Sequence, residues 1–193
     1  MICIYAPLPQ VNNSIGQTFK RRQVLPCSEG SLWQLKTGAV RVFTWAEDGT
    51  IVTLGFWGAG AIIGQALARI QPYQVQCLSQ VSARYLEVGQ LWRNESDRSL
   101  HFDRVMLAHL HQTQELLRIR SGPIPERLEQ LLLWLASQFG RYTKRGQSIG
   151  LRLTHQEIAE TIGTTRVTVT RLLHQFQREG LVSLSRQEGI VLR

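Results

Sequence analysis

The sequence LTHQEIAETIGTTRVTVTRLL, at Leu153–Leu173, decides the fold class of the C-terminal part of this chain. Thr154 and Glu157 match the T-x-x-E capping box that starts a helix, and Thr165 can cap a second helix. Gly163 lies between them, where a sharp turn can use a positive φ without steric cost. Both segments carry apolar residues at helical spacing: Ile158, Ala159 and Ile162, then Val169, Leu172 and Leu173. The stretch therefore predicts a helix-turn-helix.

The second of these helices has the composition of a helix that reads DNA. It carries Arg166 and Arg171 on its polar side, and no acidic residue occurs between Gly163 and Glu179. Two amphipathic helices joined by glycine can also form an αα-corner that binds nothing, but a solvated corner of that kind normally carries acidic residues. The charge pattern therefore favours a second helix that enters the major groove of DNA.

The expected contacts with DNA divide into base edges and backbone. Arg166, in the first turn, can donate to O6 and N7 of guanine, and Arg171 can reach a second base or a phosphate. Val167 can pack its methyl groups against the methyl group of thymine. We expect the remaining contacts to go to the phosphate backbone, from Thr165 and Thr168 on the second helix and from Thr154, His155 and Gln156 on the first.

Composition points in the same direction. The 193 residues carry a formal net charge of +8, and the isoelectric point is about 10.1, which favours a polyanionic partner. The three cysteines are odd in number and lack C-x-x-C spacing, which predicts free thiols in a reducing cytoplasm and no metal site or cofactor. No apolar run approaches the roughly 18 residues of a membrane span, and the N-terminus lacks a signal-peptide pattern. We therefore expect a cytoplasmic protein without a membrane partner.

The N-terminal half predicts a small β-barrel or sandwich. Residues 1–18 have weak structural signals and are expected to form a loose arm. Between residues 19 and 92 the pattern changes to short runs typical of strands, divided by turns. A hairpin signal, Glu47–Gly49, separates two of these runs. The expected strands are Ala39–Trp45, Ile51–Trp57, Val75–Leu78 and Ala83–Val88.

A long helix is predicted over Phe102–Arg120, where apolar residues recur at helical spacing. The apolar stripe is interrupted by His109, Gln112 and Thr113. If the helix were alone, part of this apolar face would be exposed to water. We therefore expect two copies to pack together as a homodimer. Ser121–Pro125 contains two prolines and a glycine, which end the helix and mark the best domain boundary.

The C-terminal part is predicted to be a winged helix-turn-helix. A helix over Glu126–Phe139 leads through a basic loop, Arg141–Gly146, to a short strand at Ser148–Leu153. After the helix-turn-helix, the segments Leu181–Ser185 and Ile190–Arg193 predict a β-hairpin wing.

The order of barrel, long helix, hinge and winged helix-turn-helix resembles the Crp/Fnr family of bacterial transcription regulators. The resemblance is strongest over Ile124–Arg193, and GTTRVTVTRLL at Gly163–Leu173 is most similar to the nitrogen-control branch known from cyanobacteria. Over the barrel it rests on Gly38, on the hairpin at Glu47–Gly49, and on GAIIG at Gly60–Gly64. The segment between Pro26 and Leu32 is shorter than is usual in the family.

The resemblance implies an α+β fold with an N-terminal double-stranded β-helix, a jelly-roll barrel like that of cyclic-nucleotide-binding domains. The implied function is a sequence-specific transcription regulator, which acts as a homodimer on palindromic promoter DNA with RNA polymerase as a partner. Half-sites of the GTA…TAC type are implied by Val167, where family members that read a G·C pair carry Glu. The expected divisions are a barrel with its arm at 1–100, a dimerisation helix with its hinge at 101–122, and the DNA-binding domain at 123–193.

The family's known ligands do not fit the corresponding residues. Cyclic-nucleotide members carry Glu after the glycine that Gly64 matches, and an Arg about ten residues later. This chain has Gln65 and the uncharged stretch Ile70–Gln74, so a buried phosphate would lack a cation and cyclic nucleotide binding is not expected. The arginine with which the nitrogen-control branch binds 2-oxoglutarate aligns with Ala108 or His109, and the N-terminal cysteine cluster that holds an iron–sulfur centre is missing.

An effector pocket remains a hypothesis. It would involve Gly64 and Gln65 from the barrel and the polar break of the long helix, His109, Gln112 and Thr113. The same break can instead be a polar layer that sets the register of a helix pair.

Two other functions compete with DNA-binding regulation. A cupin-type metalloenzyme needs several imidazoles or carboxylates on barrel strands, and none of the five histidines lies between residues 19 and 92, so an enzyme is not expected. An architectural or protein-binding module without sequence-specific readout is the second alternative. Salt-dependent binding to duplex DNA would distinguish it from a regulator.

Overall fold

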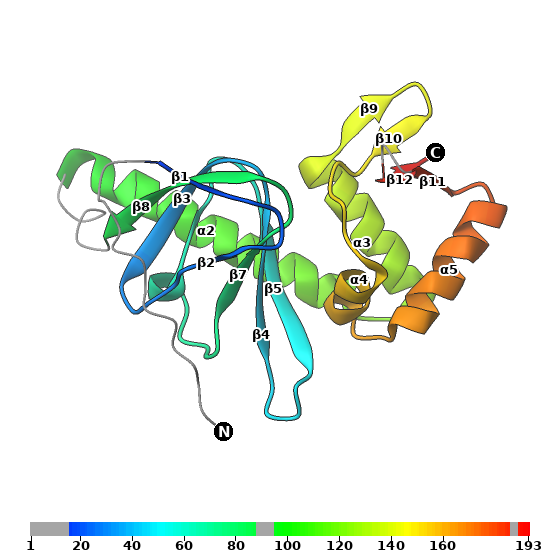
Figure 1. The fold of residues 1–193 in the computed structure, drawn as a ribbon, viewed down its shortest axis with the longest axis horizontal. Helices are drawn as coiled ribbons and strands as arrows, with labels where there is room; N and C mark the ends of the chain where they lie inside the picture. The colour runs from blue at the N-terminus through cyan, green and yellow to red at the C-terminus, as the bar shows by residue number, and fades with distance from the viewer. Residues whose placement is uncertain (1–15, 88–94, 186–188) are drawn as a thin grey trace.

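The structure is a computed structural model that describes residues 16–87, 95–185 and 189–193, with side chains in the long helix described from residue 103 onward. Most of the expected arm, Cys3, the side chain of Phe102 and the wing turn at 187–188 lie outside the described residues. The chain has an α+β fold, with an N-terminal barrel, a long helix and a C-terminal helical unit with its own small sheet (Figure 1).

The barrel consists of two four-stranded antiparallel sheets with the strand orders β1-β8-β3-β6 and β2-β7-β4-β5. Trp33, Leu35, Val42 and Val75 belong to the core between them. The strands are β1 (Gln17–Phe19), β2 (Val24–Leu25), β3 (Ser31–Thr37), β4 (Val40–Trp45), β5 (Ile51–Trp57), β6 (Ile62–Ile63), β7 (Gln74–Cys77) and β8 (Val81–Glu87). All four expected strands are confirmed to within two residues, and β4 and β5 pair across the expected hairpin.

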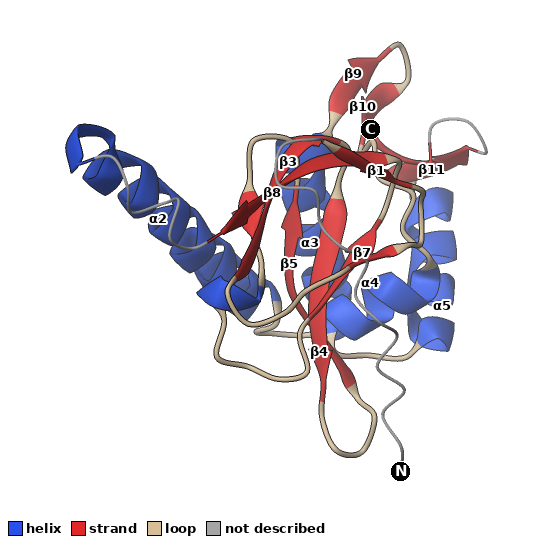
Figure 2. Ribbon diagram, turned by 60° about the vertical axis from the view of Figure 1, so that its left-hand side comes forward, coloured by secondary structure: helices blue, strands red, loops and turns tan. Residues whose placement is uncertain are grey.

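Two helices follow the barrel. Helix α2 (Glu95–Ile119) begins seven residues before the expected start, packs along β5, and extends beyond the barrel at its N-terminal end (Figure 2). Helix α3 spans Ile124–Phe139. The expected linker Ser121–Pro125 is therefore too long by two residues. Pro125 lies in the first turn of α3, where its missing N–H leaves no helical hydrogen bond unmade.

The C-terminal unit carries the predicted helix-turn-helix, α4 (His155–Ile162) and α5 (Arg166–Arg178). Its sheet has the order β11-β12-β10-β9. Strands β11 (Val182–Ser185) and β12 (Gly189–Leu192) confirm the two arms of the wing.

Two expectations about the segment before the helix-turn-helix are wrong. The expected basic loop contains strand β9 (Arg141–Thr143), which pairs with β10 (Gly146–Ser148) as a hairpin. The expected strand over Ser148–Leu153 ends at its first residue. Gly150 has φ +74°, which breaks the extended conformation and turns the chain toward the start of α4.

One apolar core holds the C-terminal unit together and reaches into the barrel. Leu131, Leu135, Ile158 and Leu173 are fully buried in it, with contributions from α3, α4 and α5. The barrel residues Ala39, Phe56 and Leu78 belong to the same cluster. The predicted domain boundary between α2 and α3 is therefore a feature of the sequence. The apolar core itself is continuous between the barrel and the C-terminal unit. Within the described ranges, no helix is long and apolar enough to cross a membrane.

Candidate nucleic-acid interface and ligand pocket

Local hydrogen bonds define both ends of the turn in the helix-turn-helix. The hydroxyl of Thr154 accepts from the N–H of Glu157 at 3.1 Å, and the Glu157 carboxylate accepts from the N–H of Thr154 at 2.6 Å. Gly163 has φ 72° and ψ 52°, the left-handed conformation that ends α4. The Thr165 hydroxyl accepts from the N–H of Thr168 at 3.2 Å and caps α5. The predicted capping box, glycine turn and second cap are all confirmed.

Helix α5 buries one face and leaves the other exposed. Val169, Leu172 and Leu173 are buried in the core, whereas Arg166, Val167 and Arg171 are exposed. Val167 keeps 77% of its surface in contact with solvent. The exposed face therefore offers two cations and one apolar side chain to whatever lies against it.

The residues expected to contact phosphates lie beside the first turn of α5. Thr154, His155 and Gln156 line a surface hollow together with Arg166. Gln156 donates through Nε2 to Oε1 of Glu160 at 2.9 Å, and the hydroxyls of Thr165 and Thr168 lie 3.0 Å apart. The helix-turn-helix thus gathers side chains from both helices around one concave surface.

His155 joins the two helices as a neutral group. Its Nδ1 lies 2.8 Å from the hydroxyl of Thr170 on α5. Partial burial, with the positive charges of Arg166 and His174, lowers the pKa of His155 below its ordinary value. A lowered pKa leaves the imidazole uncharged at neutral pH, so it serves as a hydrogen-bonding group and contributes no cation.

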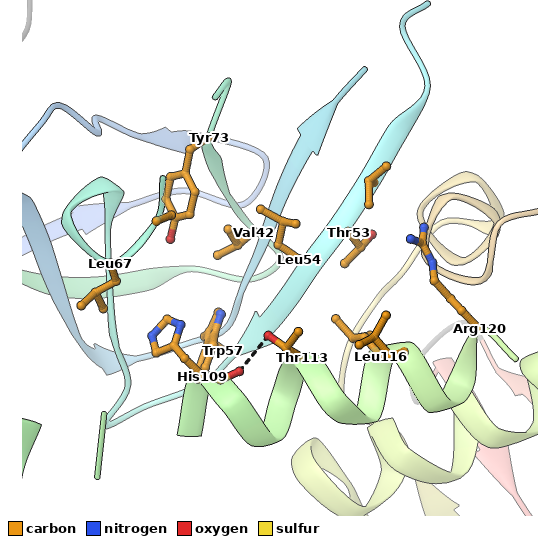
Figure 3. A pocket seen from close by; sticks show the side chains of 13 residues that line it. Val42, Thr53, Leu54, Trp57, Leu67, Tyr73, His109, Thr113, Leu116 and Arg120 are labelled. Atoms are coloured by element: carbon orange, nitrogen blue, oxygen red, sulfur yellow. Dashed lines mark hydrogen bonds between the residues drawn. The ribbon is translucent and has the colours of Figure 1, made fainter. Parts of the chain in front are cut away.

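A pocket of about 310 Å³ lies between the barrel and α2 (Figure 3). Two of the five residues expected at an effector pocket, His109 and Thr113, line it. The lining residues are Val42, Val52, Thr53, Leu54, Trp57, Leu67, Ala68, Tyr73, His109, Thr113, Leu116, Leu117 and Arg120. Most of this wall is apolar, with polar groups at separate points, as in many small-molecule sites.

The other three expected residues do not line the pocket. Gln112 accepts from the backbone N–H of Phe56, and Nε2 of Gln65 donates to the carbonyl oxygens of Ala68 at 3.1 Å and Ile70 at 3.3 Å. Gly64 has φ 152°, and a side chain there would collide with the carbonyl oxygen of Ser31. These three positions thus support the local backbone of the barrel.

His109 is held firmly on the pocket wall. Its Nε2 lies 2.9 Å from the carbonyl oxygen of Ile62, and its ring packs on Trp57 with 4.2 Å between the ring centroids. The Thr113 hydroxyl donates to the carbonyl of His109 at 2.9 Å. Burial lowers the pKa of His109, although the hydrogen bond to Ile62 opposes the shift. The imidazole is therefore neutral at pH 7 and donates its Nε2–H to Ile62.

The sequence reasoning missed a polar cluster between the barrel and α4, which we call the interdomain cluster: Arg41, Thr53, Arg120, Glu160 and Thr161. Arg41 is 2% exposed and forms an ion pair of 2.7 Å with Glu160. Its Nε and Nη2 also donate to the Thr53 hydroxyl at 3.0 Å and 2.6 Å, and that hydroxyl lies 2.9 Å from the hydroxyl of Thr161. No signal in the sequence pointed to this cluster, because Arg41 alternates with Val40 and Val42 as an outward-facing strand residue does.

Arg120, the residue directly after the end of α2, completes this cluster. Its Nε donates to the carbonyl oxygen of Thr161 at 2.8 Å, and its Nη2 donates to that of Glu160 at 3.0 Å. Both carbonyls belong to the last turn of α4, where they have no partner within the helix. Arg120 therefore stabilises the C-terminal end of the first helix of the helix-turn-helix from outside.

The two cysteines that the structure describes, Cys27 and Cys77, have the properties of inert thiols. Burial raises the pKa of Cys27 to about 12 and that of Cys77 to about 11, so both stay protonated at neutral pH. In the part of the chain that the structure describes, no three His, Cys, Asp or Glu side chains are grouped so that they could hold a metal ion.

The family model and the relatives that match this chain are all of regulatory, DNA-binding proteins. Residues 126–193 match the family model described as a Crp-like helix-turn-helix domain. The chain is 37% identical over 177 residues to the regulatory protein CysR of Synechococcus elongatus, which covers 90% of this chain and 81% of that protein. It is 34% identical over 109 residues to the global nitrogen regulator of Synechocystis sp., covering 56% of this chain and 48% of that protein.

Solved structures share the fold over nearly the whole chain. TTHB099, a transcriptional regulator of the CRP family from Thermus thermophilus, superposes with a TM-score of 0.77 at 22% identity, with 91% of each chain covered. FixK2 from Bradyrhizobium japonicum superposes with a TM-score of 0.76 at 18% identity, with 93% of each chain covered. At these identities the likeness concerns the fold.

Proposed function

Because this chain belongs to the Crp/Fnr family and is a DNA-binding transcription regulator, we propose that it binds palindromic promoter sites as a homodimer and reads them with helix α5. The observation that carries this proposal is the exposed face of α5, where Arg166, Val167 and Arg171 contact solvent and no acidic residue intervenes. We infer that Thr154, His155, Gln156, Thr165 and Thr168 hold the phosphate backbone on either side of it.

A binding titration tests the proposal. Fluorescence anisotropy of a labelled duplex with two inverted GTA half-sites is expected to give tighter binding than a duplex with the same bases scrambled. Both affinities should fall as salt increases, because phosphate contacts release counterions. Equal affinity for the two duplexes would contradict sequence-specific readout. If the protein shows no salt-dependent binding to either duplex, the result would support a protein-binding module instead.

We propose that α2 is the dimerisation helix. Its described apolar residues that remain uncovered are Met106, Leu107, Leu110 and Leu117, with exposed fractions of 40%, 50%, 52% and 66%. A second copy of the same helix would bury this stripe, and the two-fold axis would set two recognition helices about 34 Å apart, one turn of DNA.

Leu110→Glu is expected to convert the dimer into a monomer at micromolar concentration, because a charge would be buried in the helix pair. Sedimentation velocity measures this change. Ala108→Glu is the matched control, since Ala108 is also exposed on α2 but lies about 200° around the helix from Leu110. A monomeric wild-type mass that DNA leaves unchanged would overturn the homodimer.

We infer that the pocket between the barrel and α2 is an effector site. His109 and Thr113 from α2 and a largely apolar wall from the barrel support this inference. The polar break in the long helix then serves the pocket, although a role in dimer register is the alternative.

Titration calorimetry with cyclic AMP is expected to give no saturable heat. The side chain of Gln65 is engaged by the carbonyls of Ala68 and Ile70, no cation occurs at Ile70–Gln74, and the neighbouring Arg69 is exposed. A cyclic phosphate held beside Gln65 and Ile70–Gln74 would lose its hydration without gaining a charged partner from those residues. A micromolar dissociation constant would contradict this prediction.

We also propose RNA polymerase as a partner and the bacterial cytoplasm as the location, because a regulator acts where promoters are transcribed. Transcription in vitro from a promoter that carries two inverted GTA half-sites, with and without the protein, would show a change in transcript yield.

A further inference from the structure

We propose that His155 holds a DNA phosphate as an imidazolium, so that each subunit takes up a proton when the protein binds DNA. This inference rests on the proposed function, which places His155 against the phosphate backbone, and it adds the protonation state in which that contact is made. The observation that carries it is the hydrogen-bond network of the imidazole, which leaves the ring without a donor for phosphate in the free protein.

The hydrogen bonds of Thr170 fix the tautomer of His155. The Thr170 hydroxyl donates its only hydrogen to the carbonyl oxygen of Arg166 at 2.9 Å. The same hydroxyl oxygen lies 2.8 Å from Nδ1 of His155. Because the hydroxyl hydrogen is already used, this second contact is a hydrogen bond only if Nδ1 carries a proton and donates it. A neutral imidazole with its proton on Nδ1 has an acceptor at Nε2.

The Nε2 atom therefore has the wrong polarity for a phosphate. His155 is the first residue of α4, and it lines the surface hollow with Thr154, Gln156 and Arg166. The N-terminal end of a helix attracts phosphate, and within the described residues no protein group is hydrogen-bonded to Nε2. Phosphate oxygens only accept hydrogen bonds, so they would be repelled by a lone pair on Nε2. A second proton, placed on Nε2, replaces this repulsion with a charge-assisted hydrogen bond.

The other neutral tautomer is the competing arrangement. It would place the single proton on Nε2, and the Thr170 hydroxyl would have to turn away from the carbonyl of Arg166 to donate to Nδ1. That exchange gives up one hydrogen bond and yields a neutral donor. The imidazolium keeps both bonds of Thr170 and makes a hydrogen bond to phosphate that is roughly twice as strong as a neutral one. Only the imidazolium takes up a proton, so the two arrangements can be told apart.

The surroundings of His155 keep the imidazole neutral in the free protein. Partial burial lowers its pKa, and the charges of Arg166 and His174 on α5 lower the pKa further. A phosphate in the hollow would offset these two charges. The proton is therefore expected to arrive with the DNA.

The other elements around α4 do not supply the missing negative charge. On α4 itself, Glu157 closes the capping box and Glu160 forms a buried ion pair. Strand β5 has no charged residue, and Arg127 of α3 donates to the carbonyl of Ile162 at the opposite end of α4. Among the described residues, no carboxylate forms an ion pair with His155.

DNA binding and pH are thus linked in one direction. A phosphate beside Nε2 raises the pKa of His155 in the complex above its value in the free protein. Between these two values the complex holds a proton that the free protein lacks. The affinity for DNA therefore rises as the pH falls, and it levels off once the free imidazole is protonated as well. It changes about tenfold for each unit by which DNA raises this pKa.

Titration calorimetry measures the proton uptake directly. The duplex with two inverted GTA half-sites is titrated with the full chain at about pH 7.5, in PIPES and in Tris buffers of equal ionic strength. Uptake should make the binding heat more endothermic in Tris, because the deprotonation of Tris absorbs more heat. Anisotropy titrations are expected to show binding at least about fivefold tighter at pH 6 than at pH 8. Equal heats in the two buffers would mean that no proton is taken up.

Variants assign the uptake to His155. His155→Arg is expected to lose the uptake and to bind equally at both pH values, because a guanidinium is charged at each. His155→Gln should also lose the uptake, since an amide can donate without gaining a proton. His174→Gln is the matched control, because His174 is an exposed histidine of α5 that is not expected to contact DNA. Uptake that persists in His155→Arg, or that disappears in His174→Gln, would overturn the assignment.

Thr170→Val tests the tautomer. Valine has nearly the same shape without the hydroxyl, so the imidazole loses the acceptor for its Nδ1–H and can carry its single proton on Nε2. Less uptake than in the wild type is expected, and unchanged uptake would overturn the role of Thr170. Specific binding of the wild type without uptake would overturn this inference and leave the proposed function intact. Failure to bind the duplex at any pH would overturn both.

Discussion

Arg166→Ala is expected to weaken binding to the palindromic duplex by about 1–3 kcal/mol and to relax the preference at one base pair of each half-site. Arg166 is exposed in the first turn of α5, directly after the cap formed by Thr165. A guanidinium at that point can donate two hydrogen bonds to one guanine, and alanine leaves both acceptors unpaired. Anisotropy titrations with single-base variants of the duplex measure both effects.

The control is Arg178→Ala, which removes an exposed charge from the last turn of the same helix. If Arg178 contacts only phosphate, its loss should weaken binding to all duplexes alike and lower the salt slope by about one.

Val167→Glu should move the preference toward C·G at the position that Val167 contacts, because a carboxylate accepts from cytosine N4. Recovery of one common site for the wild type, Arg166→Ala and Val167→Glu, in a selection on random duplexes, would show that these side chains do not read bases.

Arg41→Met is expected to reduce the free energy of unfolding by about 3–5 kcal/mol. The side chains of Arg41 and Glu160 are only 3% and 13% exposed, so the substitution would leave a buried carboxylate without its cation. The Thr53 hydroxyl would lose two donors at the same time. Chemical denaturation followed by circular dichroism measures the change.

Arg118→Met is the matched control for the ion pair. Arg118 pairs with Glu115 at 2.8 Å, but these side chains are 55% and 40% exposed, and such surface pairs contribute about 0–1 kcal/mol. Replacing both Arg41 and Glu160 with methionine should recover part of the lost stability, since no buried charge then remains. Equal losses in Arg41→Met and Arg118→Met would show that the interdomain cluster does not stabilise the fold.

The elements that the sequence predicted well are defined by contacts between residues close in the chain. The capping box spans Thr154 to Glu157, the second cap spans Thr165 to Thr168, and the left-handed turn needs only Gly163. The hairpin between β4 and β5 closes over a few residues as well. Short-range hydrogen bonds and backbone preferences leave their pattern in neighbouring residue types, so these features and the exposed face of α5 could be read directly.

The features that the sequence did not reveal depend on residues far apart in the chain. Strand β10 lies beside β12, more than 40 residues later, and that pairing places a hairpin where a loop was expected. Gln65 and Gln112 were candidate ligand groups by their position in the sequence, but backbone groups of the barrel engage both side chains.

The sequence by itself thus determined the helix-turn-helix, the family and the candidate reading face, because each depends on local patterns. Only the tertiary structure decided that Arg41 is buried and that Arg120 joins the pocket to α4. Arg41 and Glu160 are 119 residues apart, and Arg120 lies 41 residues from Thr161. A charged residue in a strand or at a helix end looks like a surface residue until the chain folds a carboxylate or free carbonyls against it.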